Sequence, residues 1–205
     1  ANFVIKKGQT VAFVGTSGAG KSTMVDVLLG LLPPQYGKIY ADGMNIYKNL
    51  LTWQMEIGYI PQTIYLSDDS IRNNVAFGIK EDRIDEEAVI RALNQAQLHD
   101  FVEALPEGLD TFVGDRGVRL SGGQRQRIGI ARALYHDPEI LVLDEATSAL
   151  DSETESAVME AIERLQGQKT IIIIAHRLTT IQNADVIFEV NDGKVEVKSR
   201  QEVLG

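Results

Sequence analysis

The fold is decided by Thr10-Val-Ala-Phe-Val14, the glycine-rich stretch Gly15-Thr-Ser-Gly-Ala-Gly-Lys-Ser-Thr23, and the apolar-periodic run that continues to Leu32. The first run predicts a strand, and Lys21 to Leu32 predicts a helix that stops at Pro33-Pro34. The glycines between them let backbone N–H groups close around an anion, and the helix N-terminus adds its dipole. The stretch therefore predicts a phosphate-binding loop. Its expected contacts are Gly15, Thr16, Ser17, Gly18, Ala19, Gly20, Lys21, Ser22 and Thr23.

Outward from this loop, strands and helices alternate along the chain. Ile140 to Leu143 and Thr170 to Ala175 are β-branched-rich runs without alternation, typical of strands buried in a parallel sheet. Two runs flanking Asn191-Asp192-Gly193 predict an antiparallel hairpin. We therefore expect an α/β fold with a mainly parallel sheet, an antiparallel β portion and a helical insert. Further strands are expected over Lys38–Ala41 and Glu56–Ile60, and helices over Asp85–Gln97, Leu98–Leu105 and Ser121–Tyr135.

Composition excludes several classes of protein. The 205 residues are 44% hydrophobic and 24% charged, an ordinary globular balance. The absence of cysteine excludes a disulfide scaffold, a thiolate zinc site and a cysteine nucleophile. No apolar run approaches the ~18 residues that span a bilayer. The net charge of -9 argues against general binding to duplex DNA, although five arginines and no acid lie between residues 116 and 136. This basic stretch fits either an anion-facing surface or a solvated one.

Two acids follow the strand predicted at Ile140. Asp144 ends that strand, at the sheet edge where ligands of such folds bind, and is expected to hold Mg²⁺ through its water shell. Glu145 comes one residue later, where a carboxylate can accept a proton from an attacking water. The two residues predict a magnesium ligand and a general base.

A third motif, Leu120-Ser-Gly-Gly-Gln124, begins the basic helix. Ser121 and Gln124 form a capping box, which is a sufficient structural reason for both. Two glycines in a first helical turn nevertheless cost about 1 kcal/mol each relative to alanine. Because glycine permits close backbone approach, Gly122 and Gly123 predict a second anion site.

Together the motifs resemble the nucleotide-binding domain of an ABC (ATP-binding cassette) transporter. Along the chain, the motifs occur in the order phosphate loop, Tyr59-Ile-Pro-Gln62, LSGGQ, ILVLDE, Ser148-Ala-Leu-Asp151 and His176. The resemblance covers nearly the whole chain. It implies one domain over residues 1–205, with a P-loop NTPase core at 1–62 and 136–205 and a helical subdomain at 63–135.

The resemblance also implies roles for the residues. Two copies would form a head-to-tail dimer with two ATP molecules and their Mg²⁺ ions at the interface. Because Glu145, His176 and the LSGGQ motif are all intact, both sites are expected to be competent and the dimer to be a homodimer. Gln62 would sense Mg²⁺ and the attacking water, Glu145 would be the general base, and His176 would contact the γ-phosphate. The residues expected to reach the partner's ATP are Ser121, Gly122, Gly123, Gln124 and Asp151.

The exporter branch of the family is favoured by two stretches. Thr111-Phe-Val-Gly-Asp-Arg-Gly117 and Ser70-Ile-Arg-Asn-Asn74 are similar to segments of exporters, where the former contacts transmembrane helices. We therefore expect an ATPase at the cytoplasmic face of a membrane, with a transmembrane domain in the same polypeptide and no nucleic-acid partner. The aromatic residue that stacks on adenine in the family is expected upstream of Ala1, as is a further strand.

Three other functions compete with this interpretation. A soluble ABC ATPase acting on DNA would carry long coiled coils, and no heptad run is present. A general P-loop kinase or GTPase would leave LSGGQ, Gln62 and His176 unexplained. A non-catalytic transporter subunit would tend to lack Glu145, His176 or the LSGGQ motif, and all three are intact.

Overall fold

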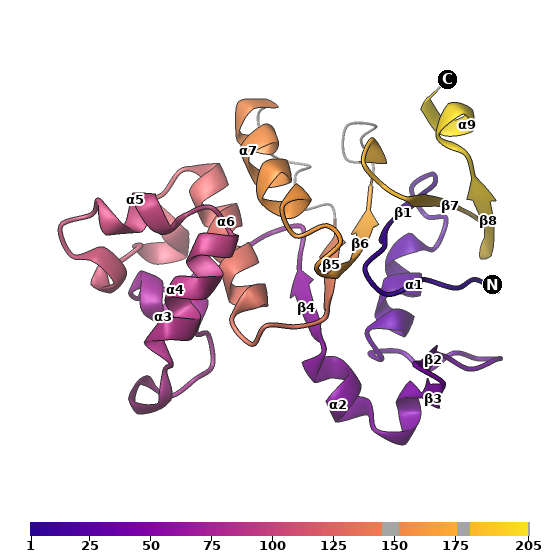
Figure 1. Ribbon diagram of the computed structural model, residues 1–205, viewed down its shortest axis with the longest axis horizontal. Coiled ribbons are helices and arrows are strands. Elements are labelled where there is room, and N and C mark those ends of the chain that lie inside the picture. The colour runs from indigo at the N-terminus through magenta and orange to yellow at the C-terminus, as the bar shows by residue number, and fades with distance from the viewer. Residues whose placement is uncertain (145–151, 176–180, 205) are drawn as a thin grey trace.

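The computed structural model describes residues 1–144, 152–175 and 181–204. Its described strands form a six-stranded sheet in the order β4-β5-β6-β1-β7-β8, in which only the β7–β8 pair is antiparallel (Figure 1). The expected α/β class, with a mainly parallel sheet and an antiparallel portion, is confirmed. The strands are β1 Thr10–Val14, β4 Ile57–Ile60, β5 Ile140–Asp144, β6 Thr170–Ile174, β7 Val186–Asn191 and β8 Lys194–Lys198, with a separate pair of β2 Tyr40–Ala41 and β3 Met44–Asn45.

The central strands are buried because both faces of the sheet are covered. On one face, Val142 and Ile172 pack in a cluster with Val25 of helix α1 (Lys21–Leu28). On the other, Leu143 and Ile173 join a larger cluster that includes residues of α6 (Gly122–Leu134) and α7 (Ser152–Glu163). Helices α1 and α6 therefore lie on opposite faces of the sheet.

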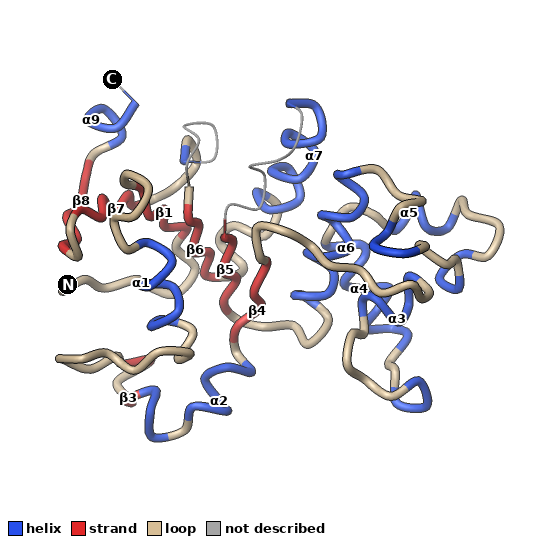
Figure 2. The backbone as a smooth tube through the Cα atoms, turned by 180° about the vertical axis from the view of Figure 1, so that it is seen from behind, coloured by secondary structure: helices blue, strands red, loops and turns tan. Residues whose placement is uncertain are grey.

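Helices α3 to α6 gather beyond β4, which is an edge strand of the sheet (Figure 2). Helix α6 joins this helical region to the sheet, since an ideal Cβ placed on Gly58 of β4 would lie 2.5 Å from the backbone oxygen of Ala133. The exact division of the chain at residues 62 and 136 stays a prediction. The helices are α1 Lys21–Leu28, α2 Leu50–Met55, α3 Ile71–Val75, α4 Glu86–Gln95, α5 His99–Glu103, α6 Gly122–Leu134, α7 Ser152–Glu163 and α9 Arg200–Leu204.

The first helix ends earlier than the sequence predicted. Its last residue is Leu28, four short of Leu32. Gly30 adopts a left-handed φ of 72°, its N–H donates to Val27 O, and the N–H of Leu31 donates to Asp26 O. These two bonds form a Schellman motif, which satisfies the last carbonyls of the helix. The glycine, and not Pro33-Pro34, therefore stops α1.

Most other predicted elements are present with shorter ends. The strand expected over Lys38–Ala41 is reduced to Tyr40–Ala41. The predicted hairpin is confirmed, with Asp192 and Gly193 both at positive φ in its turn. Helices α2, α3, α7 and α9 were not predicted.

Candidate nucleotide-binding site

The glycine-rich stretch lies between β1 and α1, as the sequence predicted. Gly15 comes so close to β7 that an ideal Cβ would lie 2.2 Å from the backbone oxygen of Val190. Gly20, the N-cap of α1, has a φ of 100° and provides no side-chain cap. The first turn of this eight-residue helix holds no acid that would repel an anion from its N-terminus.

Lys21 is buried, with 5% of its surface exposed. Its ammonium donates to the carbonyl oxygens of Gly15 at 2.8 Å and Thr16 at 3.1 Å. The side chain of the first helical residue therefore folds back along its own loop. An anion that enters the loop would meet this positive charge together with the backbone N–H groups.

Ser22 and Asp144 lie at the same edge of the sheet. Ser22 is the exposed second residue of α1, and Asp144 is the last residue of β5. Strands β1, β6 and β5 are parallel neighbours, so their carboxyl ends share that edge. Gln62, two residues beyond the end of β4, is exposed there too. The structure thus places a hydroxyl, a carboxylate and an amide after three strands of one sheet.

Tyr59 belongs to this edge and was missed by sequence reasoning. Its hydroxyl donates to Asp144 Oδ2 at 3.1 Å. Partial burial, followed by the neighbouring Asp144 charge and this hydrogen bond, raises the pKa of Tyr59 to about 12. The phenol is therefore a protonated donor at neutral pH. No periodicity in the sequence signals the contact, because the two residues are 85 positions apart.

The LSGGQ motif begins α6 as the predicted capping box. Ser121 Oγ accepts from the Gln124 N–H at 3.2 Å, and Gln124 Oε1 accepts from the Ser121 N–H at 2.8 Å. Ser121 is exposed and Gly123 is buried. Since α6 and α1 cover opposite faces of the sheet, one copy of the chain does not join this motif to its own phosphate loop.

Three of the expected site residues, Glu145, Asp151 and His176, lie outside the described residues, as does Ser148. Among the described residues, no cluster of three or more His, Cys, Asp or Glu side chains could hold a metal ion.

Three arginines of the basic stretch form hydrogen bonds within the helical region. Arg125 Nη1 donates to Leu120 O at 2.6 Å, and Arg127 Nη1 donates to Gln97 O at 2.9 Å. Arg132 donates to Asn74 O and Tyr65 O and lies 4.6 Å from the centre of the Phe77 ring. Burial lowers the pKa of Arg132 and Arg127. These three side chains bind backbone oxygens of the same chain. They therefore match neither interpretation of the basic stretch, which was expected to be an anion-facing surface or a solvated one.

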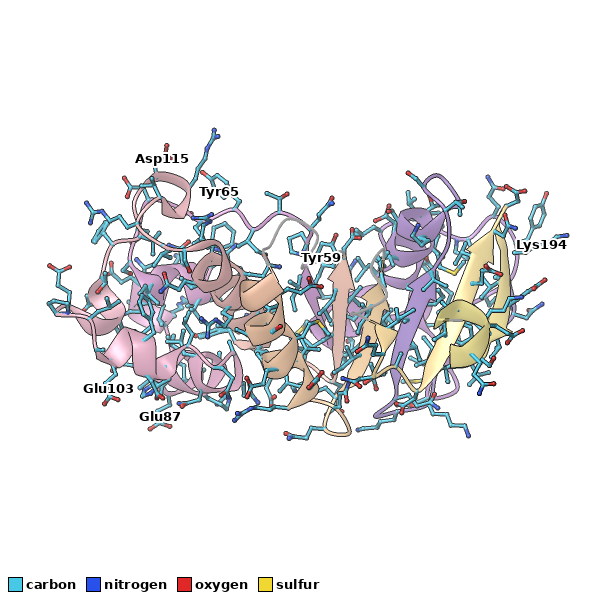
Figure 3. The ribbon with its side chains drawn as sticks, turned by 90° about the horizontal axis from the view of Figure 1, so that it is seen from above. Tyr59, Tyr65, Glu87, Glu103, Asp115 and Lys194 are labelled. Atoms are coloured by element: carbon cyan, nitrogen blue, oxygen red, sulfur yellow. The ribbon has the colours of Figure 1, made fainter. Side chains whose placement is uncertain are left out.

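The two stretches that suggested an exporter lie side by side. Ile71 N–H donates to Thr111 O at 3.0 Å, and Val113 N–H donates to Asp69 O at 3.0 Å. Phe112 forms an isolated bridge with Ser70 and is 50% exposed. Asp115, in the short 3-10 helix that follows (Asp115–Gly117), projects from the upper side of the helical region in the view of Figure 3. No helix within the described ranges is long and apolar enough to cross a membrane.

Comparison with known proteins identifies the family. The family model described as "ABC transporter" matches residues 1–148. The chain belongs to the ABC transporter family. The ABC transporter BEA3 of Gibberella fujikuroi is 47% identical over 99% of the chain, which covers 16% of that protein. The ATP-dependent lipid A-core flippase of Idiomarina loihiensis is 46% identical over 99% of the chain, which covers 35% of it.

A solved structure of a bacterial Atm1-family ABC exporter with ATP bound matches 98% of the chain with a TM-score of 0.85 and 40% identity. The chain covers 35% of that ABC exporter. The prediction of an exporter-type nucleotide-binding domain is thus confirmed. The chain spans only a minor part of these ABC transporters.

Proposed function

We propose that this chain binds and hydrolyses ATP as the motor domain of an ABC exporter. The observation that carries the proposal is the buried Lys21 held inside a glycine-rich loop, with the Asp144 carboxylate at the same sheet edge. The loop would take the phosphates through its backbone N–H groups, and Lys21 would neutralise their charge. The names of the relatives, which include an ATP-dependent flippase, agree with this activity.

The residues fit a magnesium ion. Hydroxyl, carboxylate and amide oxygens are hard ligands of the kind Mg²⁺ prefers, and Ser22, Asp144 and Gln62 supply one of each. When bound, the ion would neutralise charge on the transferring phosphate. Glu145 would take the proton of the attacking water, and His176 would contact the γ-phosphate.

We further propose a head-to-tail dimer, with two identical copies as the expected assembly. The packing of α6, which Ser121 caps, and of α1 on opposite faces of the sheet supports it, since Ser121, Gly122, Gly123 and Gln124 would then serve the partner's site. Asp151 would contact the partner's phosphate loop. A transmembrane domain would contact this chain at the cytoplasmic face of a membrane, through the surface near Phe112. Movements of the ATP-driven dimer would pass to the transmembrane domain through that surface.

The test compares two substitutions in the phosphate site. Lys21→Ala should weaken ATP binding, because the loop loses its positive charge. Glu145→Gln should bind ATP normally and hydrolyse it about 10²- to 10⁴-fold more slowly, because the amide cannot accept a proton. Titration calorimetry and phosphate release measure the two effects. Full hydrolysis by Glu145→Gln, or unchanged binding by Lys21→Ala, would contradict the proposal.

A further inference from the structure

Tyr59 and Asp144 extend from neighbouring strands toward the same face of the sheet. Tyr59 of β4 pairs in register with Val142 of β5, and Asp144 follows two residues later on β5. Side chains two residues apart on a strand share a face, so all three point to the face that α1 covers. A tyrosine is long enough to reach two positions along the neighbouring strand, and its hydroxyl lies 3.1 Å from Asp144 Oδ2.

Tyr59 belongs to the edge strand β4, on the side of the sheet next to the helical region (Figure 3). Its side chain remains 40% exposed, so the core does not require its ring to the extent that it requires Ile60, which is fully buried. Asp26 of α1 is also close enough for its charge to act on the phenol. The hydroxyl therefore lies on the α1 side of the sheet, within hydrogen-bond distance of the strand that ends in Asp144.

We propose that Tyr59 is a positioning residue, whose hydroxyl holds the Asp144 carboxylate in the orientation that receives the hydrated Mg²⁺ of the nucleotide. A carboxylate on a strand end can rotate about its side-chain bonds, and a donated hydrogen bond selects one orientation before the ligand arrives. Partners of this kind raise metal affinity by fixing the ligand they contact. The inference rests on the proposed function, which assigns Asp144 to Mg²⁺.

In the opposite role, the Tyr59 hydrogen bond would hold Asp144 away from the metal. The two roles predict opposite changes in the contribution of Mg²⁺ to nucleotide affinity. Removing the hydroxyl weakens this contribution if Tyr59 positions Asp144 for the metal, and strengthens it if Tyr59 holds Asp144 away.

The experiment measures binding of a fluorescent, non-hydrolysable ATP analogue in excess Mg²⁺ and in EDTA. The ratio of the two affinities is the metal's contribution. Tyr59→Phe should lower this ratio about tenfold and leave the affinity in EDTA unchanged. Tyr47→Phe is the matched control, because it also removes a phenol hydrogen bond, to Leu32 O at 2.8 Å, away from Asp144. It should leave the ratio unchanged, and thermal unfolding should show that both variants are folded.

Asp144→Asn separates failure of the inference from failure of the proposed function. If Asp144→Asn leaves the ratio unchanged, the magnesium assignment is wrong and this inference falls with it. If Asp144→Asn lowers the ratio while Tyr59→Phe leaves it unchanged or raises it, the positioning role alone is wrong. In the Asp144→Asn background, Tyr59→Phe should have no further effect, since it acts only through that carboxylate. An additional loss there would also overturn the inference.

Discussion

At the scale of single residues, Ser121 carries two functions that its chemistry allows to be separated. Within the chain, its hydroxyl oxygen caps α6 by accepting from the Gln124 N–H. In the proposed dimer, the same exposed side chain faces the partner's ATP. A capping acceptor can be a hydroxyl or a carboxylate, but a phosphate tolerates only the former beside it.

We predict that Ser121→Ala mainly loses stability, whereas Ser121→Asp mainly loses activity. Ser121→Ala should lower the free energy of unfolding by about 0.5–2 kcal/mol, because α6 loses its cap. Ser121→Asp should keep most of that stability and reduce ATP hydrolysis at least about tenfold through charge repulsion. Urea unfolding measures the free energy of unfolding, and phosphate release measures ATP hydrolysis. Wild-type hydrolysis by Ser121→Asp would show that this residue does not face ATP.

At the scale of elements, two glycines allow α6 to pack closely against its neighbours. Gly58 makes room for the backbone of α6, and Gly129 makes room for a side chain that packs on α6. On β4, a Cβ at Gly58 would meet the backbone oxygen of Ala133 at 2.5 Å. Within α6, a Cβ at Gly129 would meet only the side chain of Ile64, the nearest atom being Cδ1 at 2.4 Å. A backbone oxygen in a packed helix cannot move aside, whereas a half-buried isoleucine in the segment after Gln62 can rotate.

Gly58→Ala should therefore destabilise the chain more than Gly129→Ala. We expect Gly58→Ala to cost about 1–3 kcal/mol, the usual range for overpacking a core. For Gly129→Ala, up to about 1 kcal/mol of gained helix propensity offsets the displacement of Ile64. Equilibrium unfolding of both variants in urea measures the difference. An equal or larger loss for Gly129→Ala would mean that the segment after Gln62 is as rigid as the α6 backbone.

At the scale of the whole molecule, the sheet separates the phosphate loop from the LSGGQ motif. Helix α1 packs on one face, and α6, the last helix of the helical region along the chain, packs on the other (Figure 1). A complete site therefore needs a second copy in the proposed dimer, so defects in the two motifs should complement one another.

A mixture of Lys21→Ala and Ser121→Asp proteins should recover ATP hydrolysis that neither shows alone. A dimer formed from one copy of each variant contains one site with both defects and one site with none. The measurement is phosphate release by the mixture at total protein concentrations where wild-type hydrolysis depends on concentration. If the mixture stays inactive there while light scattering shows that the variants associate, the shared-site arrangement is wrong.

The sequence by itself determined the local features. The strand, glycine loop and helix around Lys21, the capping box at Ser121 and the hairpin turn at Gly193 each depend on residues a few positions apart. Backbone conformation at glycines and helix caps is a short-range property, so a linear pattern is enough to predict it. The buried strands were also predictable, since long runs of β-branched residues fit strands covered on both faces.

Only the tertiary structure decided which distant residues meet. Tyr59 reaches Asp144 across 85 positions, and Arg132 reaches the carbonyl oxygens of Asn74 and Tyr65 across 58 and 67. Strand order and helix packing create these contacts, and neither leaves a periodic signal in the chain. A tyrosine on a strand or an arginine on a helix has the same local pattern whether it binds solvent, an anion or a backbone oxygen, because its partner comes from another part of the fold.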